Sequence, residues 1–186
     1  MKEIAKEFFS FLFEILKTVT IAALIVIPIR YFLFQPFIVR GDSMLPNFEN
    51  GDYLIIDEIS FRLKEPKRGE VIVFAPPNQP ATRYIKRIIG LPGETIQIKD
   101  GKITIFEKSG DIKILDEESY LPNSDFTSGN LKVALGEKEY FVLGDNRQFS
   151  SDSRIFGALP KENIVGKVFL KAFPFTKISR AQAPSY

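Results

Sequence analysis

The feature that most constrains this chain is an almost uncharged apolar run close to its N-terminus. Residues 18–34 read TVTIAALIVIPIRYFLF, with Arg30 as the one charged residue. As a helix this run spans about 26 Å, close to the roughly 30 Å of a bilayer's hydrocarbon core. Pro28 would kink such a helix without preventing it. The run predicts a membrane anchor in residues 1–34, with its transmembrane part at about 15–34.

A cleaved signal peptide and a buried core helix are the alternatives to an anchor. No small-residue cleavage site follows the run, which disfavours a signal peptide, whereas a buried helix stays open. Lys2, Lys6 and Lys17 precede the run. Because lysines and arginines set membrane orientation, they favour a cytoplasmic N-terminus and a single pass that puts the rest of the chain on the outer face.

From Gln35 onward the sequence changes to short β-like runs separated by Gly, Pro, Asn and Asp. Asp100-Gly101, between two alternating runs, is a strong hairpin signal. One helical turn is expected at 160–163, and residues 179–186 are expected to fray. The predicted strands are Phe37–Arg40, Tyr53–Glu58, Glu70–Phe74, Thr82–Ile89, Thr95–Lys99, Lys102–Phe106, Asp111–Leu115, Tyr140–Leu143 and Ile164–Phe173.

These runs predict a mainly β fold. We expect an antiparallel folded sheet or open barrel as the catalytic domain in residues 35–186. A small β insertion at about 95–143 belongs to it, and one N-terminal transmembrane helix precedes it. The 186 residues suffice to bury a core in one such domain, which we expect to be monomeric.

The composition excludes several kinds of chemistry. The chain has 0 His and 0 Cys, so it can form no disulfide, thiolate nucleophile, Cys/His zinc site or Ser-His-Asp triad. A general acid or base that acts near neutral pH must then be a carboxylate, a tyrosine or a lysine with a shifted pKa. A net charge of +2 argues against nucleic-acid binding. We expect no metal and no other cofactor.

Two segments combine reactive side chains with turn residues. In GDSMLP, residues 41–46, Ser43 follows a predicted strand and precedes a proline-restricted turn. A hydroxyl is a poor nucleophile without a base, so this segment alone also fits an ordinary surface turn. In RYIKRIIGLPGE, residues 83–94, Lys86 and Arg87 alternate along a largely apolar strand, so one cation faces what the strand buries. Burial lowers a lysine pKa and makes lysine a usable base. An edge strand with both cations in solvent is the alternative.

The third segment is GDNRQFSSDSR, residues 144–154, which holds two Asp, two Arg and three Ser. This pattern suggests a structured loop tied by Asp–Arg pairs. A protease with a carboxylate pair, Asp145 and Asp152, is disfavoured, because nearby arginines lower both pKa values and leave no shared proton.

Together these segments resemble the type I signal peptidase (leader peptidase) family, whose members use a Ser-Lys dyad. The matching text is GDSMLP, GDYLIIDE, GEVIVF, YIKRIIGLPGE and GDNRQFSSDSR, in this order behind an apolar run. The resemblance extends from the anchor to about Lys171. It implies an almost all-β catalytic core with a smaller insertion, which agrees with the predicted strands.

The resemblance also implies a role for each matching residue. Ser43 would be the nucleophile, Lys86 the neutral general base, and Ser150 the serine that hydrogen-bonds and orients this lysine. Arg87 would be structural. The residues bracing the catalytic loop would be Asp145, Arg147, Asp152 and Arg154. Shallow pockets that admit only small substrate side chains would be formed by Phe37, Val39, Met44, Phe48, Leu54 and Ile85.

The activity implied is removal of N-terminal signal peptides from exported preproteins, after small residues at −1 and −3, through an acyl-enzyme. The substrate would bind as an added strand, and the Ser43 N–H would face the oxyanion. The partners are then signal-peptide-bearing preproteins and the lipid bilayer. The location implied is a bacterial cytoplasmic membrane, with an organelle membrane as the alternative.

Two departures and two alternatives remain. Some family members carry a hydroxyl residue two positions before the nucleophile; this chain has Gly41, so a second oxyanion donor would come from the backbone. Gln148-Phe149 replaces a polar pair common in the last segment.

A self-cleaving Ser-Lys repressor is soluble, so the anchor argues against it. A membrane-anchored β-module that binds exported chains without cleaving them would need neither the serine nor the lysine.

Overall fold

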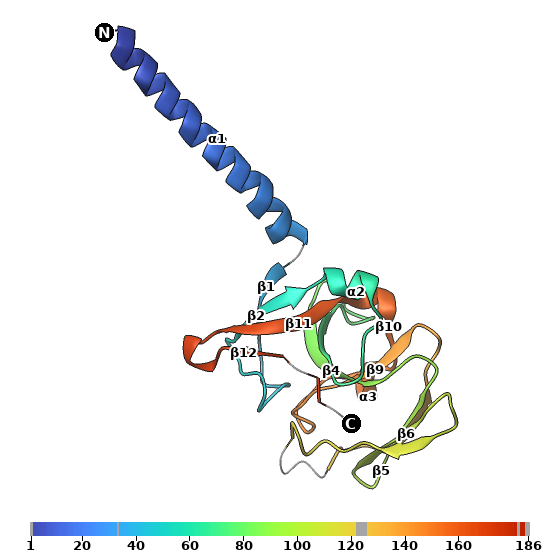
Figure 1. The fold of residues 1–186 in the computed structure, drawn as a ribbon. Coiled ribbons are helices and arrows are strands. Elements are labelled where there is room, and N and C mark those ends of the chain that lie inside the picture. The colour runs from blue at the N-terminus through green and yellow to red at the C-terminus, as the bar shows by residue number, and fades with distance from the viewer. Residues whose placement is uncertain (1, 33, 122–125, 182, 185–186) are drawn as a thin grey trace.

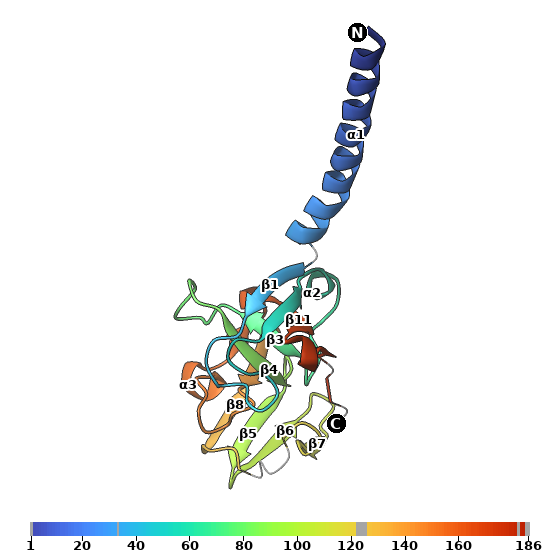
Figure 2. The same cartoon turned by 90° about the vertical axis from the view of Figure 1, so that its left-hand side faces the viewer.

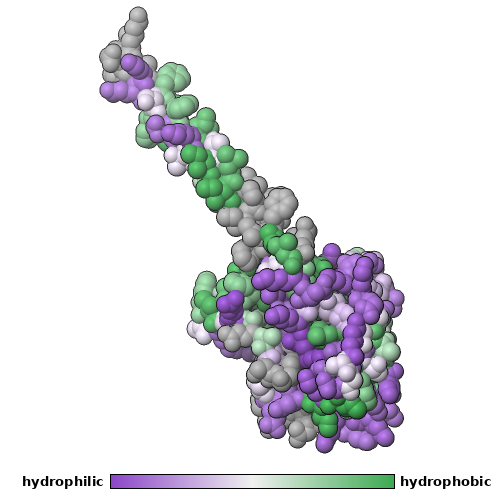
Figure 3. Space-filling view, turned by 45° about the vertical axis from the view of Figure 1, so that its right-hand side comes forward, coloured by the Kyte–Doolittle hydropathy of each residue, from purple (hydrophilic) through white to green (hydrophobic). Residues whose placement is uncertain are grey.

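The computed structural model describes residues 2–32, 34–121, 126–181 and 183–184, without the side chains of 2–5, 27–35 and 62. One long helix, α1 (Lys2–Phe32), projects from a body of β-strands (Figure 1). Its segment Lys6–Val26 is long and apolar enough to cross a membrane, and none of it is buried against the described structure. Hydrophobic side chains cover much of this helix, whereas the visible face of the body is mostly hydrophilic (Figure 3). The predicted span of 15–34 continues into residues whose side chains are outside the description.

The main sheet has eight antiparallel strands that curl into a half-barrel. Seven follow the order β1-β2-β11-β3-β4-β9-β10, and β12 pairs with β11. The long strand β11 bulges against both β2 and β3, and such bulges bend a strand and increase its twist. The strands are β1 (Phe34–Ile38), β2 (Tyr53–Asp57), β3 (Val71–Phe74), β4 (Tyr84–Gly90), β9 (Glu139–Leu143), β10 (Leu159–Pro160), β11 (Ile164–Phe173) and β12 (Ser179–Arg180).

A second sheet of four strands, in the order β7-β6-β5-β8, forms the end of the body farthest from α1 (Figure 2). Its strands are β5 (Thr95–Lys99), β6 (Lys102–Phe106), β7 (Ile112–Ile114) and β8 (Leu131–Ala134). The short helices of the body are α2 (Ile59–Leu63), α3 (Ser153–Phe156), and the 3-10 turns η1 (Lys161–Asn163) and η2 (Phe175–Lys177).

Strand patterning explains where the core lies. β5 and β6 bury alternate residues, as expected for strands with one face on a core, whereas β4 is buried almost throughout because both of its faces are covered. Three apolar clusters result. One of them, built around Val39, Leu54 and Ile85, packs directly under the turn that follows β1.

The predicted fold class is confirmed, and β5, β6 and β11 have the predicted bounds. The helical turn at 161–163 is also confirmed. The predictions missed β8, β10, α2 and α3. Fraying from residue 179 was wrong for Ser179–Arg180, which pair with β11; Gln182, Ser185 and Tyr186 lie outside the described residues.

Candidate active site

The turn between β1 and β2 carries Ser43. Gly41 has a φ of +86°, a conformation that favours glycine, and its N–H donates to Asn50 Oδ1 at 3.0 Å. The Leu45 N–H donates to the Asp42 carbonyl at 3.2 Å and closes the turn over Ser43. The sequence therefore folds here into a tight turn that presents a half-buried serine at the end of a strand.

β4 brings Lys86 to this serine. Lys86 Nζ lies 2.7 Å from Ser43 Oγ and donates to the Ile85 carbonyl at 2.8 Å. Only 3% of Lys86 is exposed. Burial lowers the pKa of Lys86 to about 8, although the negative charges of Asp152 and Asp145 act to raise it. A lysine with this pKa is neutral in a useful fraction of molecules near neutral pH and can accept the serine proton.

Arg87, next along β4, points to the opposite face. Its Nε and Nη2 donate to the two carboxylate oxygens of Asp145 at 2.8 and 2.6 Å, and its guanidinium lies 4.2 Å from the centre of the Tyr120 ring. Asn47 Nδ2 also donates to Asp145, at 2.8 Å. One buried carboxylate thus joins β4, the turn after Ser43 and the loop after β9. Burial of the pair is consistent with a structural role for Arg87.

The loop at residues 144–154 is held by two further arginines. Arg154 binds both oxygens of Asp152 at 2.8 Å, and Asp152 Oδ2 accepts from the Gly144 N–H at 3.1 Å. Arg147 donates through Nε to the Gly144 carbonyl at 3.0 Å and pairs with Glu117 at 2.5 Å. The structure therefore brings together the four residues expected to brace this loop.

Ser150 lies beside Ser43 but does not hydrogen-bond Lys86 as expected. Its buried Oγ makes no hydrogen bond within the described residues, since Lys86 donates to Ser43 and Ile85 instead. A Cβ added at Gly144 would lie 2.2 Å from Ser150 Oγ and 2.5 Å from the Ser43 carbonyl oxygen. Gly144 thus allows the serine loop to pack directly on the Ser43 backbone.

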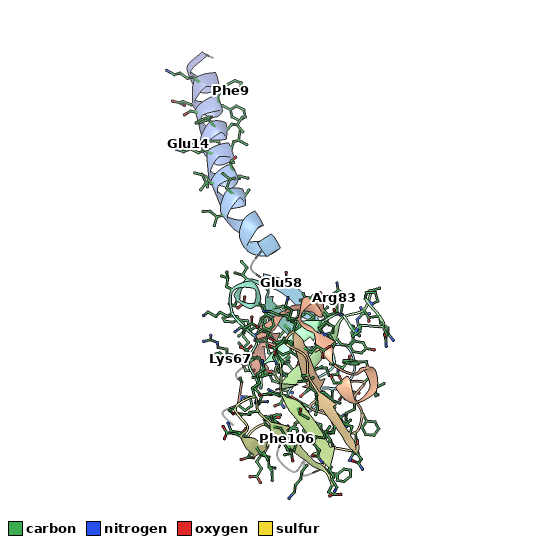
Figure 4. The ribbon with its side chains drawn as sticks, turned by 90° about the vertical axis from the view of Figure 1, so that its right-hand side faces the viewer. Phe9, Glu14, Glu58, Lys67, Arg83 and Phe106 are labelled. Carbon is green, nitrogen blue, oxygen red and sulfur yellow. The ribbon has the colours of Figure 1, made fainter. Side chains whose placement is uncertain are left out.

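A groove of about 630 Å³ opens beside Ser43 and Lys86. Arg83, on its wall, lies with Glu58 at the end of the body next to α1, whereas Phe106 marks the opposite end (Figure 4). β4 pairs with β9 from Arg87 onward, so Tyr84–Lys86 pair with β3 along one edge and border the groove. An extended peptide can pair with such an edge.

The pocket predictions need correction. Phe37 and Ile85 line the groove, but four of the expected pocket residues lie in the core cluster beneath it. Their side chains face inward and are at most 5% exposed; they are Val39, Met44, Phe48 and Leu54. Ile38 and Phe149 line the groove in their place, and Phe149 is 74% exposed.

Three supporting residues were missed by the sequence reasoning: Asn47, Glu117 and Tyr120. Asn47 follows the nucleophile turn, and the other two come from the loop between β7 and β8. They reach the site only through tertiary contacts, so no local spacing could have revealed them. Within the described ranges, no group of three Asp or Glu side chains could hold a metal ion.

Comparison with known proteins shows the family of this chain. The family described as signal peptidase, peptidase S26, matches residues 12–173. A probable signal peptidase I-2 of Synechocystis sp. (strain ATCC 27184 / PCC 6803 / Kazusa) is 35% identical over 170 residues, 89% of this chain and 75% of its own. A signal peptidase I of Bacillus licheniformis is 36% identical over 173 residues, 91% and 92% of the two chains.

A crystal structure of a signal peptidase I from Enterococcus faecalis V583 is 31% identical, covers 56% of this chain and 97% of that one, and superposes with a TM-score of 0.46. The bacterial relatives and the single apolar helix fit a membrane-anchored protein. Because the family match spans most of the residues, and the relatives align over most of their own length, this chain belongs to the signal peptidase I family of serine endopeptidases, peptidase S26.

Proposed function

We propose that this chain removes signal peptides from exported preproteins through a Ser43–Lys86 dyad, after small residues at −1 and −3. Family membership supports signal-peptide removal by a serine protease. The dyad rests on one observation: a lysine that is 3% exposed, with a pKa of about 8, lies 2.7 Å from a serine hydroxyl in a groove.

The reaction begins with proton transfer from Ser43 Oγ to the neutral Lys86 amine while Oγ bonds to the scissile carbonyl carbon. The negative charge passes to the carbonyl oxygen, which the Ser43 backbone N–H stabilises. The Lys86 ammonium then protonates the leaving amine, the C–N bond breaks, and an ester to Ser43 remains. Lys86 next takes a proton from water, the hydroxide displaces Ser43 Oγ, and Lys86 returns the proton to the serine.

The groove accounts for the choice of substrate. The preprotein pairs as a strand with Tyr84–Lys86, so backbone hydrogen bonds carry the binding. Phe37 and Ile85 line the groove beside the reacting atoms and favour small side chains at −1 and −3. A loop tied by Asp145, Arg147, Asp152 and Arg154 carries Ser150 against the nucleophile. In this proposal the monomeric enzyme crosses a bacterial cytoplasmic membrane once, with its catalytic body on the outer face.

Cleavage of a preprotein with alanine at −1 and −3 tests this proposal. The detergent-solubilised parent should cut it once, whereas Ser43→Ala and Lys86→Met should be inactive yet folded by circular dichroism. Lys102→Met, at an exposed lysine of β6, is the matched control and should retain activity. Cleavage by Lys86→Met would refute the dyad. A parent that binds the preprotein but never cuts it would instead support a binding module.

A further inference from the structure

Asn146 makes two hydrogen bonds to the backbone on either side of the nucleophile. Its side-chain Nδ2 donates to the Asp42 carbonyl at 3.1 Å, and its backbone N–H donates to the Ser43 carbonyl at 3.0 Å. Asn146 therefore holds both peptide groups that flank the Cα of Ser43. This fixes the backbone from which the Ser43 hydroxyl projects.

The first of these peptide groups carries the proposed oxyanion donor. The Asp42 carbonyl and the Ser43 N–H belong to one planar trans peptide, so they point in opposite directions. A hydrogen bond that fixes the carbonyl consequently fixes the direction of the N–H. Within the described part of the chain the Ser43 N–H makes no hydrogen bond, so it is free to bind a ligand oxygen.

The need for such support follows from the residues around Ser43. Gly41 has no side chain to donate a hydrogen bond, and glycine restricts its own backbone less than any other residue would. The Leu45 N–H also binds the Asp42 carbonyl, but it belongs to the same turn and moves with it. Asn146 binds the same carbonyl from a separate element, the loop at residues 144–154. Asp152 and Arg147 hold this loop through hydrogen bonds to Gly144.

We infer that Asn146 is a positioning residue of the oxyanion hole, which acts through the Asp42–Ser43 peptide rather than on the substrate. This inference rests on the proposed endopeptidase function. The hole is thereby pre-organised before substrate arrives, and pre-organised donors are the ones that lower a transition-state barrier. Asn146 should matter for turnover and little for substrate binding.

The test uses the full-length enzyme in detergent with Asn146→Ala and Asn146→Asp. Asn146→Ala removes the side-chain bond but retains the backbone bond to Ser43, and Asn146→Asp replaces the donor by an acceptor of equal size. Asn163→Ala is the matched control, because Asn163 Nδ2 likewise donates to a backbone carbonyl, that of Ala75, at 2.9 Å. We expect kcat on the preprotein to fall roughly 10–100-fold in both Asn146 variants, with KM nearly unchanged.

Two further readouts separate this role from a merely structural one. A peptide aldehyde ending in alanine forms a hemiacetal with Ser43 and places an oxygen in the hole; its affinity should fall by the same factor as kcat. The apparent pKa of the pH–rate profile, which reports Lys86, should not move. The melting temperature shows whether each variant is folded.

Several results would overturn the inference. One is an unchanged kcat in the Asn146 variants, and another is a loss of aldehyde affinity no larger than in Asn163→Ala. A third is a loss of activity together with a displaced pH profile, which would mean that Asn146 supports Lys86 instead. A parent enzyme that cleaves no preprotein would instead refute the proposed function itself. The parent measurement therefore distinguishes the two failures.

Discussion

The pKa of Lys86 predicts the pH dependence of the reaction at the scale of one residue. In the proposed mechanism Lys86 must be neutral to accept the serine proton, and burial lowers its pKa to about 8. We expect kcat/KM to rise about tenfold per pH unit below pH 7 and to level off above pH 8 to 9, as for a single deprotonation. Initial rates on a preprotein between pH 5.5 and 10 would show this. A flat profile would contradict a lysine base.

The same buried lysine should reduce stability. Holding Lys86 charged at pH 7, with a folded pKa of about 8 against 10.5 in the unfolded chain, costs the folded state about 3 kcal/mol. Lys86→Met should therefore melt at a higher temperature than the parent at pH 7. Between pH 8 and 10.5 the unfolded parent binds more protons than the folded one, so parent stability rises and the difference shrinks. Thermal melts at pH 7 and 10 measure this; a less stable variant at pH 7 would contradict it.

Gly144 should tolerate no side chain. A Cβ at this position would lie 2.5 Å from the Ser43 carbonyl oxygen, and a displacement of the nucleophile by 1 Å can reduce turnover roughly 100-fold. We expect Gly144→Ala to lose activity by about that factor. Gly136→Ala is the control, because the atoms nearest to its Cβ would belong to the flexible Glu139 side chain, with the carboxylate oxygen at 3.1 Å. Equal activities of the two variants would show that the loop can shift to accommodate the added Cβ without displacing Ser43.

At this scale Ser43 and Lys86 were predicted through the resemblance of several ordered segments to a known family, because each segment alone also fitted an ordinary turn or edge strand. The contacts of Asn47, Glu117 and Asn146 depend on segments up to 104 residues apart. Neither spacing nor composition records such contacts. Four residues predicted from the resemblance to line the pockets, Val39, Met44, Phe48 and Leu54, lie in the core instead, because matching a motif position does not show which way a side chain points.

Among the elements, the loop between β7 and β8 clamps the catalytic loop. Glu117 accepts from both terminal nitrogens of Arg147, a buried arginine that also contacts Thr127. Removing one partner of a buried ion pair costs roughly 3 kcal/mol, so Glu117→Ala should lower the melting temperature by about 5–10 °C and reduce kcat. Its exposed neighbour provides the control, Glu118→Ala, which should behave like the parent. Scanning calorimetry and preprotein cleavage would decide; no difference between the variants would rule out the clamp.

The hairpin of β5 and β6 was predictable from the sequence, whereas β8 was not. The predicted bounds of β5 and β6 match the structure. These strands flank an Asp-Gly turn, and the turn and the alternation of apolar and polar residues on both sides predict the same hairpin. β8 was not predicted, because its four residues, LKVA, follow a long polar, loop-like stretch; in the structure all four pair with β5.

The orientation of the whole molecule can be tested directly, because the chain contains 0 Cys. A single introduced cysteine is then the only thiol. In intact bacterial cells Ser109→Cys, on the β body, should react with a membrane-impermeant maleimide, whereas Lys6→Cys, at the start of the apolar span, should react only after permeabilisation. The reverse pattern would contradict the proposed orientation, and equal labelling of both sites would contradict a single pass.

The neighbouring cations of β4 have a consequence for newly made copies of this protein. A slip of one residue in strand pairing exchanges the faces of Lys86 and Arg87 and presents a guanidinium to Ser43. Arginine keeps its proton at physiological pH, so under the proposed mechanism such a molecule would have no base to activate Ser43. A newly made copy therefore becomes competent for the proposed reaction only once β4 has paired in its correct register.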